Sequence, residues 1–147
     1  FKGLKYRQEI IYQSKKLTII NDSKATSFSS SVSLLKSLTN VYWIVGGQAK
    51  KGDKLLLPKK NCKNFKAYIF GANKNFFISR IKKLMRYESF LDLKFLIKKL
   101  CLEVKVDKKI THKTILFSPS AASFDNFKNF EKRGEYFNQL IKKYING

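Results

Sequence analysis

The sequence predicts an α/β fold in which a mostly parallel sheet carries helices on both faces. Four short apolar runs, at 17–23, 41–50, 66–73 and 113–123, each end in small or polar residues, as buried strands followed by loops do. Segments with helical spacing of apolar residues separate these runs. Strands that alternate with helices in this way form parallel sheets with crossover connections. Because 44% of the 147 residues are hydrophobic, we expect one domain with its own core over residues 1–147.

The individual elements follow from local patterns. Two extended runs around "QSKK" (13–16) predict an N-terminal β-hairpin whose second strand is the first strand of the main sheet. Apolar residues recur with helical spacing at 28–38, 77–85 and 93–100, and each set predicts a helix. The last helix carries an apolar stripe from 127 to 144, on which Gly134 falls. A glycine there costs about 1 kcal/mol of helix propensity, so we expect it to permit a close approach of helix to sheet.

The composition limits the classes of function. The net charge is +21, but 27 of the 31 basic residues are Lys, which occur in every segment, whereas proteins that read nucleic acids favour Arg. We interpret the charge as a general basic surface; a surface for anionic small substrates and a nucleic-acid-binding module are the alternatives. No apolar run of 18 residues and no signal peptide is present, which predicts a cytoplasmic protein without a membrane partner. Cys62, Cys101 and His112 are too scattered to predict a zinc site.

Polar side chains are concentrated in the loops that follow the four predicted strands, "NDSKATS", "GGQAKKGD", "GAN" and "SPSAAS". Ligands of open α/β sheets bind at the carboxyl ends of the strands. Thr26 or Ser27 can cap the helix that starts at Phe28, and Ser123 has the same relation to the last helix. Two helix starts together with Lys50 would surround an acidic small molecule. The alternative is that these residues are plain caps and a solvated lysine.

Catalytic signatures are missing from the sequence. "GQAKKGDK" from Gly47 begins like a phosphate-binding P-loop, but Asp53 and Lys54 stand where Lys and Ser or Thr are required. No Ser/His/Asp set and no paired carboxylates are recognisable. We therefore expect binding groups in this chain, without catalytic residues or metal ligands of its own.

Three motifs carry a family resemblance. "INDSKAT" (20–26), "GGQAK" (46–50) and "SPSAASFDNFKNFEKRGEYF" (118–137), preceded by "FKGLKYRQE", resemble the C-terminal domain of the D-glutamate-adding Mur ligases (MurD). The resemblance spans nearly the whole chain and implies a Rossmann-like domain. In this family an N-terminal domain for the UDP-sugar and a central ATPase domain come first. A first residue of Phe instead of Met and the missing P-loop suggest a fragment without those two domains.

The resemblance also implies an activity and a set of site residues. The family enzyme uses ATP and Mg²⁺, bound mainly by the central domain, to join UDP-MurNAc-L-alanine to D-glutamate through an acyl phosphate, a step of peptidoglycan synthesis. The residues that would hold D-glutamate are Thr26, Lys50, Ser123 and Phe124, with Phe130 nearby. Arg7 and Asp22 would contact the nucleotide, and Lys24 would order the loop around it. The fragment alone would be inactive.

Departures from the family and other readings remain. Tyr6 stands where the family usually has His beside Arg7, and Ser27, Gln48, Ala49, Ser120 and Ala121 also replace the usual residues. A related ligase domain, such as that of folylpolyglutamate synthase, is an alternative that the "NDSKAT" loop disfavours. A stand-alone basic module that binds nucleic acid is another. The last is an inactive remnant whose motifs only cap helices.

Overall fold

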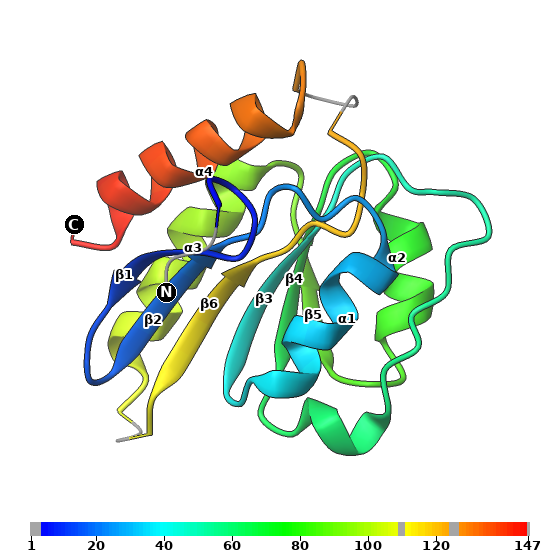
Figure 1. Ribbon diagram of the computed structural model, residues 1–147. Coiled ribbons are helices and arrows are strands. Elements are labelled where there is room, and N and C mark those ends of the chain that lie inside the picture. The colour runs from blue at the N-terminus through cyan, green and yellow to red at the C-terminus, as the bar shows by residue number, and fades with distance from the viewer. Residues whose placement is uncertain (1–3, 109–110, 124–126, 147) are drawn as a thin grey trace.

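The computed structural model describes residues 4–108, 111–123 and 127–146. Its strands form one six-stranded sheet in the order β1-β2-β6-β3-β4-β5 (Figure 1). Strands β1 and β2 pair antiparallel, and every other neighbouring pair is parallel. The predicted α/β class, the mostly parallel sheet and the N-terminal hairpin are therefore confirmed. The strands are β1 (Glu9–Gln13), β2 (Leu17–Asn21), β3 (Val41–Gly46), β4 (Lys66–Phe70), β5 (Arg86–Ser89) and β6 (Lys113–Phe117).

Helices cover both faces of this sheet. Figure 1 shows α1 and α2 on one face and α3 and α4 on the other. Side chains of the strands alternate between the two layers: Trp43 of β3 packs in the layer of α1 and α2, and Ile44 in that of α3 and α4. Because both faces are buried, the central strands are continuous apolar runs, which is why they were visible in the sequence. The helices are α1 (Phe28–Ser37), α2 (Lys74–Ile81), α3 (Leu93–Val106) and α4 (Phe130–Tyr144), with a short 3₁₀ helix at Lys59–Cys62.

Three elements differ from the sequence-based expectation. Strand β5 was not predicted, because its sequence "RYES" is largely exposed at the sheet edge and lacks an apolar run. Helix α2 ends at Ile81, so Leu84 and Met85 lie beyond it. Helix α4 begins at Phe130 and not near Phe127, because the Asn129 side chain caps it by accepting a hydrogen bond from the Lys132 N–H.

Gly134 permits a close contact, but the partner is not the one predicted. A Cβ atom at this position would lie 2.5 Å from Cδ1 of the buried Tyr6 ring, so the space is filled by the N-terminal segment. The Gly134 carbonyl also accepts a 3.0 Å hydrogen bond from Asn21 Nδ2 at the end of β2. Gly134 therefore lets α4 approach the N-terminal segment, whereas its link to the sheet is a hydrogen bond through Asn21.

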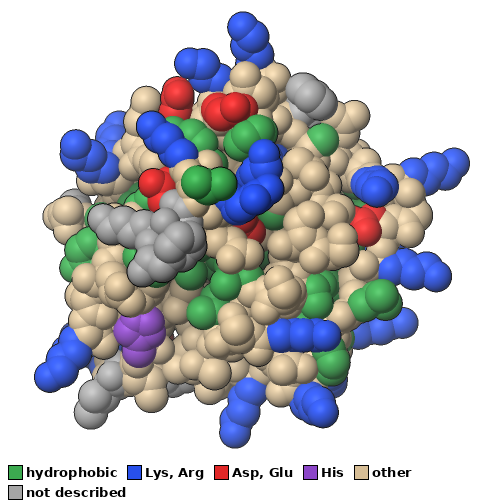
Figure 2. Space-filling model, viewed as in Figure 1, with side chains coloured by type: hydrophobic (Ala, Val, Ile, Leu, Met, Phe, Trp, Pro, Cys, Tyr) green, Lys and Arg blue, Asp and Glu red, His purple; other side chains and the backbone are tan. Residues whose placement is uncertain are grey.

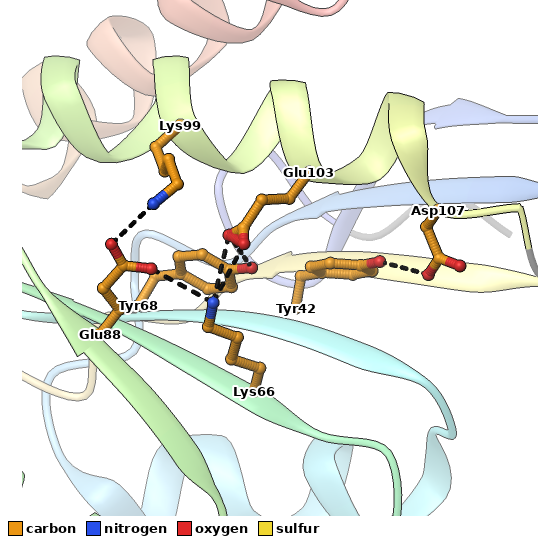
Figure 3. Close-up of polar contacts among 7 residues, drawn as sticks. All are labelled: Tyr42, Lys66, Tyr68, Glu88, Lys99, Glu103 and Asp107. Carbon is orange, nitrogen blue, oxygen red and sulfur yellow. Dashed lines mark hydrogen bonds and ion pairs between the residues drawn. The ribbon is translucent and has the colours of Figure 1, made fainter.

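A cluster of charged and phenolic side chains fastens α3 to the sheet (Figure 3). At its centre the Glu103 carboxylate lies 3.0 Å from Lys66 Nζ and accepts a 2.8 Å hydrogen bond from the Tyr68 hydroxyl. Burial and this carboxylate together raise the pKa of Tyr68, so its hydroxyl stays protonated. Glu88, Lys99, Tyr42 and Asp107 extend the cluster along the helix.

None of the helices in the described ranges combines the length and the apolar character needed to cross a bilayer.

Candidate functional site

The loops that follow the parallel strands meet at the carboxyl edge of the sheet. Strand β6 lies between β2 and β3, so the strand order switches there, where open α/β sheets place their ligands. Two hydrogen bonds, of 3.0 and 3.1 Å, join Gln48 after β3 to Ala122 after β6. The Ala49 N–H donates a 2.8 Å hydrogen bond to Asn73 Oδ1, which adds the loop after β4. The structure thus brings three of the predicted loops together.

Asp22 forms a buried junction beneath this edge. Only 3% of the residue is exposed, and its Oδ1 accepts a 3.0 Å hydrogen bond from the Gln8 N–H. The Ser118 hydroxyl donates a 2.7 Å hydrogen bond to its Oδ2. Burial raises the pKa of Asp22 to about 6, although both hydrogen bonds lower it. Both carboxylate oxygens are used within the chain, so Asp22 holds the N-terminal segment to the loops after β2 and β6. Its contact with a nucleotide stays a prediction.

A serine cluster continues this junction into α1. Ser31 Oγ lies 2.6 Å from Ser120 Oγ and is also hydrogen-bonded to the Ser118 hydroxyl. The indole N–H of Trp43 donates a 2.9 Å hydrogen bond to the Ser118 carbonyl. All of these groups are buried, and their mutual hydrogen bonds offset the cost of removing them from water. Ser31 was not predicted from the sequence to be part of this edge.

Arg133 belongs to this edge but was not among the site residues predicted from the sequence. It is 1% exposed and lies on α4. Its Nη1 donates a 2.8 Å hydrogen bond to the Ala121 carbonyl, and its Nε donates a 3.1 Å hydrogen bond to Ser23 Oγ. Its Nη2 also donates to the Ser23 carbonyl. Two features of the sequence could have found it: Arg is rare in this Lys-rich chain, and position 133 lies within the motif at 118–137.

The predicted ligand residues form the outer layer of the edge. Arg7, Lys24, Thr26 and Lys50 are exposed, whereas Ser123 is 4% exposed. Lys24 Nζ lies 4.7 Å from the ring centroid of Phe130, so the first turn of α4 holds this lysine over the loop by a cation–π contact. Phe124 lies outside the described residues.

The predicted helix caps are wrong. Helix α1 does start at Phe28, but the Phe28 N–H donates a 2.8 Å hydrogen bond to the side chain of Asp53. The Ser27 side chain caps nothing, and an anion placed there would meet the Asp53 carboxylate. Ser123 does not cap α4, whose cap is Asn129; the Ser123 carbonyl accepts a hydrogen bond from the Phe127 N–H instead. Helix starts therefore contribute less to anion binding than the sequence predicted.

Lys and Arg side chains form no stripe on the face of the molecule that Figure 2 shows. Figure 2 shows Lys and Arg side chains spread over the whole visible face. This distribution favours the interpretation as a general basic surface. In the part of the chain that the structure describes, no group of three or more His, Cys, Asp or Glu could hold a metal ion.

A mostly parallel sheet with helices on both faces and a polar, lysine-bearing carboxyl edge defines a Rossmann-like domain. Comparison with known proteins makes this more specific, although no family model matches the sequence. The chain is 37% identical over 143 residues to a UDP-N-acetylmuramoylalanine–D-glutamate ligase of Wolbachia sp. subsp. Brugia malayi, and 37% identical over 145 residues to that of Francisella philomiragia. These matches cover 97% and 96% of this chain but only 28% and 34% of the relatives.

A solved structure agrees at the level of the fold. The UDP-N-acetylmuramate-alanine ligase MurC of Thermotoga maritima superposes with a TM-score of 0.55 and 14% identity, over 97% of this chain and 31% of that chain. The chain belongs to the Mur ligase family and is a homologue of the C-terminal part of its D-glutamate-adding members. It spans about a third of the length of those relatives.

Proposed function

We propose that the chain is the D-glutamate-binding C-terminal domain of an ATP-dependent ligase that adds D-glutamate to UDP-MurNAc-L-alanine in the cytoplasm. The observation that carries this proposal is the 37% identity to such ligases over 97% of the chain. Residues 1–147 would form one domain of the whole protein, and an N-terminal UDP-sugar domain and a central ATPase domain would supply the rest.

The proposed role of this domain is to bind and orient the amino acid. Lys50 would pair with a carboxylate of D-glutamate, and the hydroxyls of Thr26 and Ser123 would hydrogen-bond to it. Phe124 would contribute to the same site mainly through its backbone, with Phe130 near the amino acid. Holding the amine against an acyl phosphate removes translational and rotational freedom before the reaction, which is worth up to about 7 to 11 kcal/mol in ideal cases.

Nucleotide contact is proposed for the N-terminal side of the edge. Arg7 is exposed and would reach a phosphate or ribose group directly. Asp22 would reach the nucleotide only by exchanging one of its two hydrogen bonds, to Gln8 or Ser118. Lys24, held by Phe130, would order the loop between them. ATP with Mg²⁺, held mainly by the central domain, would supply the phosphoryl group that activates the carboxylate.

The test is a ligation assay of the whole protein. We expect phosphate release from ATP that requires both UDP-MurNAc-L-alanine and D-glutamate, and a product that carries one added glutamate by mass. L-Glutamate in place of D-glutamate should give little product. Phosphate release that ignores glutamate, together with nucleic-acid binding that weakens steeply with salt, would instead support the basic-module alternative.

A further inference from the structure

We propose that Arg133 is the positioning residue of the amino-acid site, which it shapes by locking the loop after β2 to the loop after β6. The inference rests on the proposed function and adds a residue that has no part in the predicted ligand set. Its basis is a buried guanidinium with a separate hydrogen bond to each of the two loops.

The fork of Arg133 spans the two halves of the site. On one side Nε and Nη2 bind the hydroxyl and the carbonyl of Ser23, the residue before Lys24. On the other side Nη1 binds the carbonyl of Ala121, two residues before Ser123. The distance between the Lys24–Thr26 side and the Ser123 side is therefore set through one rigid, planar group.

Further hydrogen bonds join the loop after β2 to α4, the helix that carries Arg133. Ser23 Oγ also donates a 2.7 Å hydrogen bond to the Phe130 carbonyl, so the loop after β2 is bound to the first turn of α4. One turn further along α4, Asn21 Nδ2 donates to the Gly134 carbonyl and to Asn138 Oδ1, at 3.0 and 2.8 Å. Helix α4 and the loop after β2 thus form one unit, and Arg133 extends that unit to the loop after β6.

A lysine at position 133 could not make the same set of hydrogen bonds. A guanidinium presents its donors in a fixed plane, whereas an ammonium is a point charge that would have to choose between Ser23 and Ala121. A buried charge is tolerated only when it is well hydrogen-bonded, so Arg133→Lys should relax one of the two loops. The charge itself is kept by this substitution, which separates geometry from electrostatics.

The first test is kinetic and uses the whole protein. We expect Arg133→Lys to raise KM for D-glutamate by about 10- to 100-fold, as misplacement of a bound reactant does. KM for ATP should change less than about threefold, within the scatter of remote substitutions. Arg86→Lys is the matched control, since Arg86 is exposed on the edge strand β5, and it should leave every constant unchanged.

A second readout does not depend on activity. The backbone amides of Lys24, Ala25 and Ala122 donate hydrogen bonds to backbone carbonyls. The acceptors are Tyr6, Asp22 and Gln48, respectively. Arg133→Lys should speed their hydrogen exchange together while the amides of α3 stay protected. If Arg133→Lys does not fold, Ser23→Ala removes one end of the fork and should produce the same joint loss of protection.

The outcomes separate the two proposals. A wild-type protein without D-glutamate-dependent ligation overturns the proposed function, whatever the exchange data show. An active wild-type protein whose folded Arg133→Lys variant keeps its KM for D-glutamate and its exchange rates overturns the positioning role. Equal loss of protection over the whole chain in both Arg133→Lys and Ser23→Ala would also overturn it, because the effect would then be global.

Discussion

The Ser118 hydroxyl donates a 2.7 Å hydrogen bond to the Asp22 carboxylate, and both side chains are buried where the loops after β2 and β6 meet. Burial outweighs this hydrogen bond and raises the pKa of Asp22 from 3.8 to about 6. The folded chain therefore holds a proton at Asp22 more tightly than the unfolded chain does.

Asp22 should make stability fall as the pH rises from about 4 to about 6. In this window the native state binds more protons than the unfolded state, so the stabilisation present below pH 4 is lost progressively as the pH rises through about 6. The loss should be about 2 to 3 kcal/mol. Asp22→Asn should flatten this dependence, as measured by urea unfolding followed through the fluorescence of the buried Trp43. An unchanged slope in the variant would assign the pH dependence to other groups.

Gly134→Ala should destabilise the chain, although alanine is the better helix former. The new methyl group would lie 2.5 Å from the Tyr6 ring, so the N-terminal segment must move. Overpacking of this kind costs about 1 to 3 kcal/mol, which exceeds the gain of about 1 kcal/mol in helix propensity. Glu135→Ala, at the next and exposed position of α4, is the control and should have little effect. A stabilised Gly134→Ala variant in thermal unfolding would contradict the packing.

Glu103→Gln should weaken the attachment of α3. The Glu103 carboxylate lies 3.0 Å from Lys66 Nζ and accepts a hydrogen bond from the Tyr68 hydroxyl. The substitution removes the negative charge of this carboxylate. We expect a loss of about 1 to 3 kcal/mol in the free energy of unfolding. The matched control is Glu135→Gln, whose exposed partner Lys132 lies 3.5 Å away and which should cost less than about 0.5 kcal/mol. If chemical denaturation gave the same loss of unfolding free energy for both variants, the cluster around Glu103 would not stabilise the attachment of α3.

The sequence was most informative where local pattern decides structure. Buried strands such as β3 are continuous apolar runs, and the polar loops after them locate the edge, so the fold class and the site region were predictable. Strand β5 was not, because an exposed edge strand has no apolar signature. The cap of α1 comes from Asp53, 25 residues away, and Arg133 binds Ser23, 110 residues away. Contacts at such separations depend on the tertiary fold and leave no local signal.

The most direct test of the account compares two adjacent, exposed lysines, Lys50 and Lys51, in the whole protein. Lys50 lies within the family motif and is proposed to bind a carboxylate of D-glutamate; Lys51 follows it outside the motif. A lost hydrogen bond between charged groups costs about 1.5 to 3 kcal/mol. Lys50→Ala should therefore lower kcat/KM for D-glutamate by about 10- to 150-fold, whereas Lys51→Ala should leave it near the wild-type value. Equal values of kcat/KM for the two variants would contradict the proposed D-glutamate site.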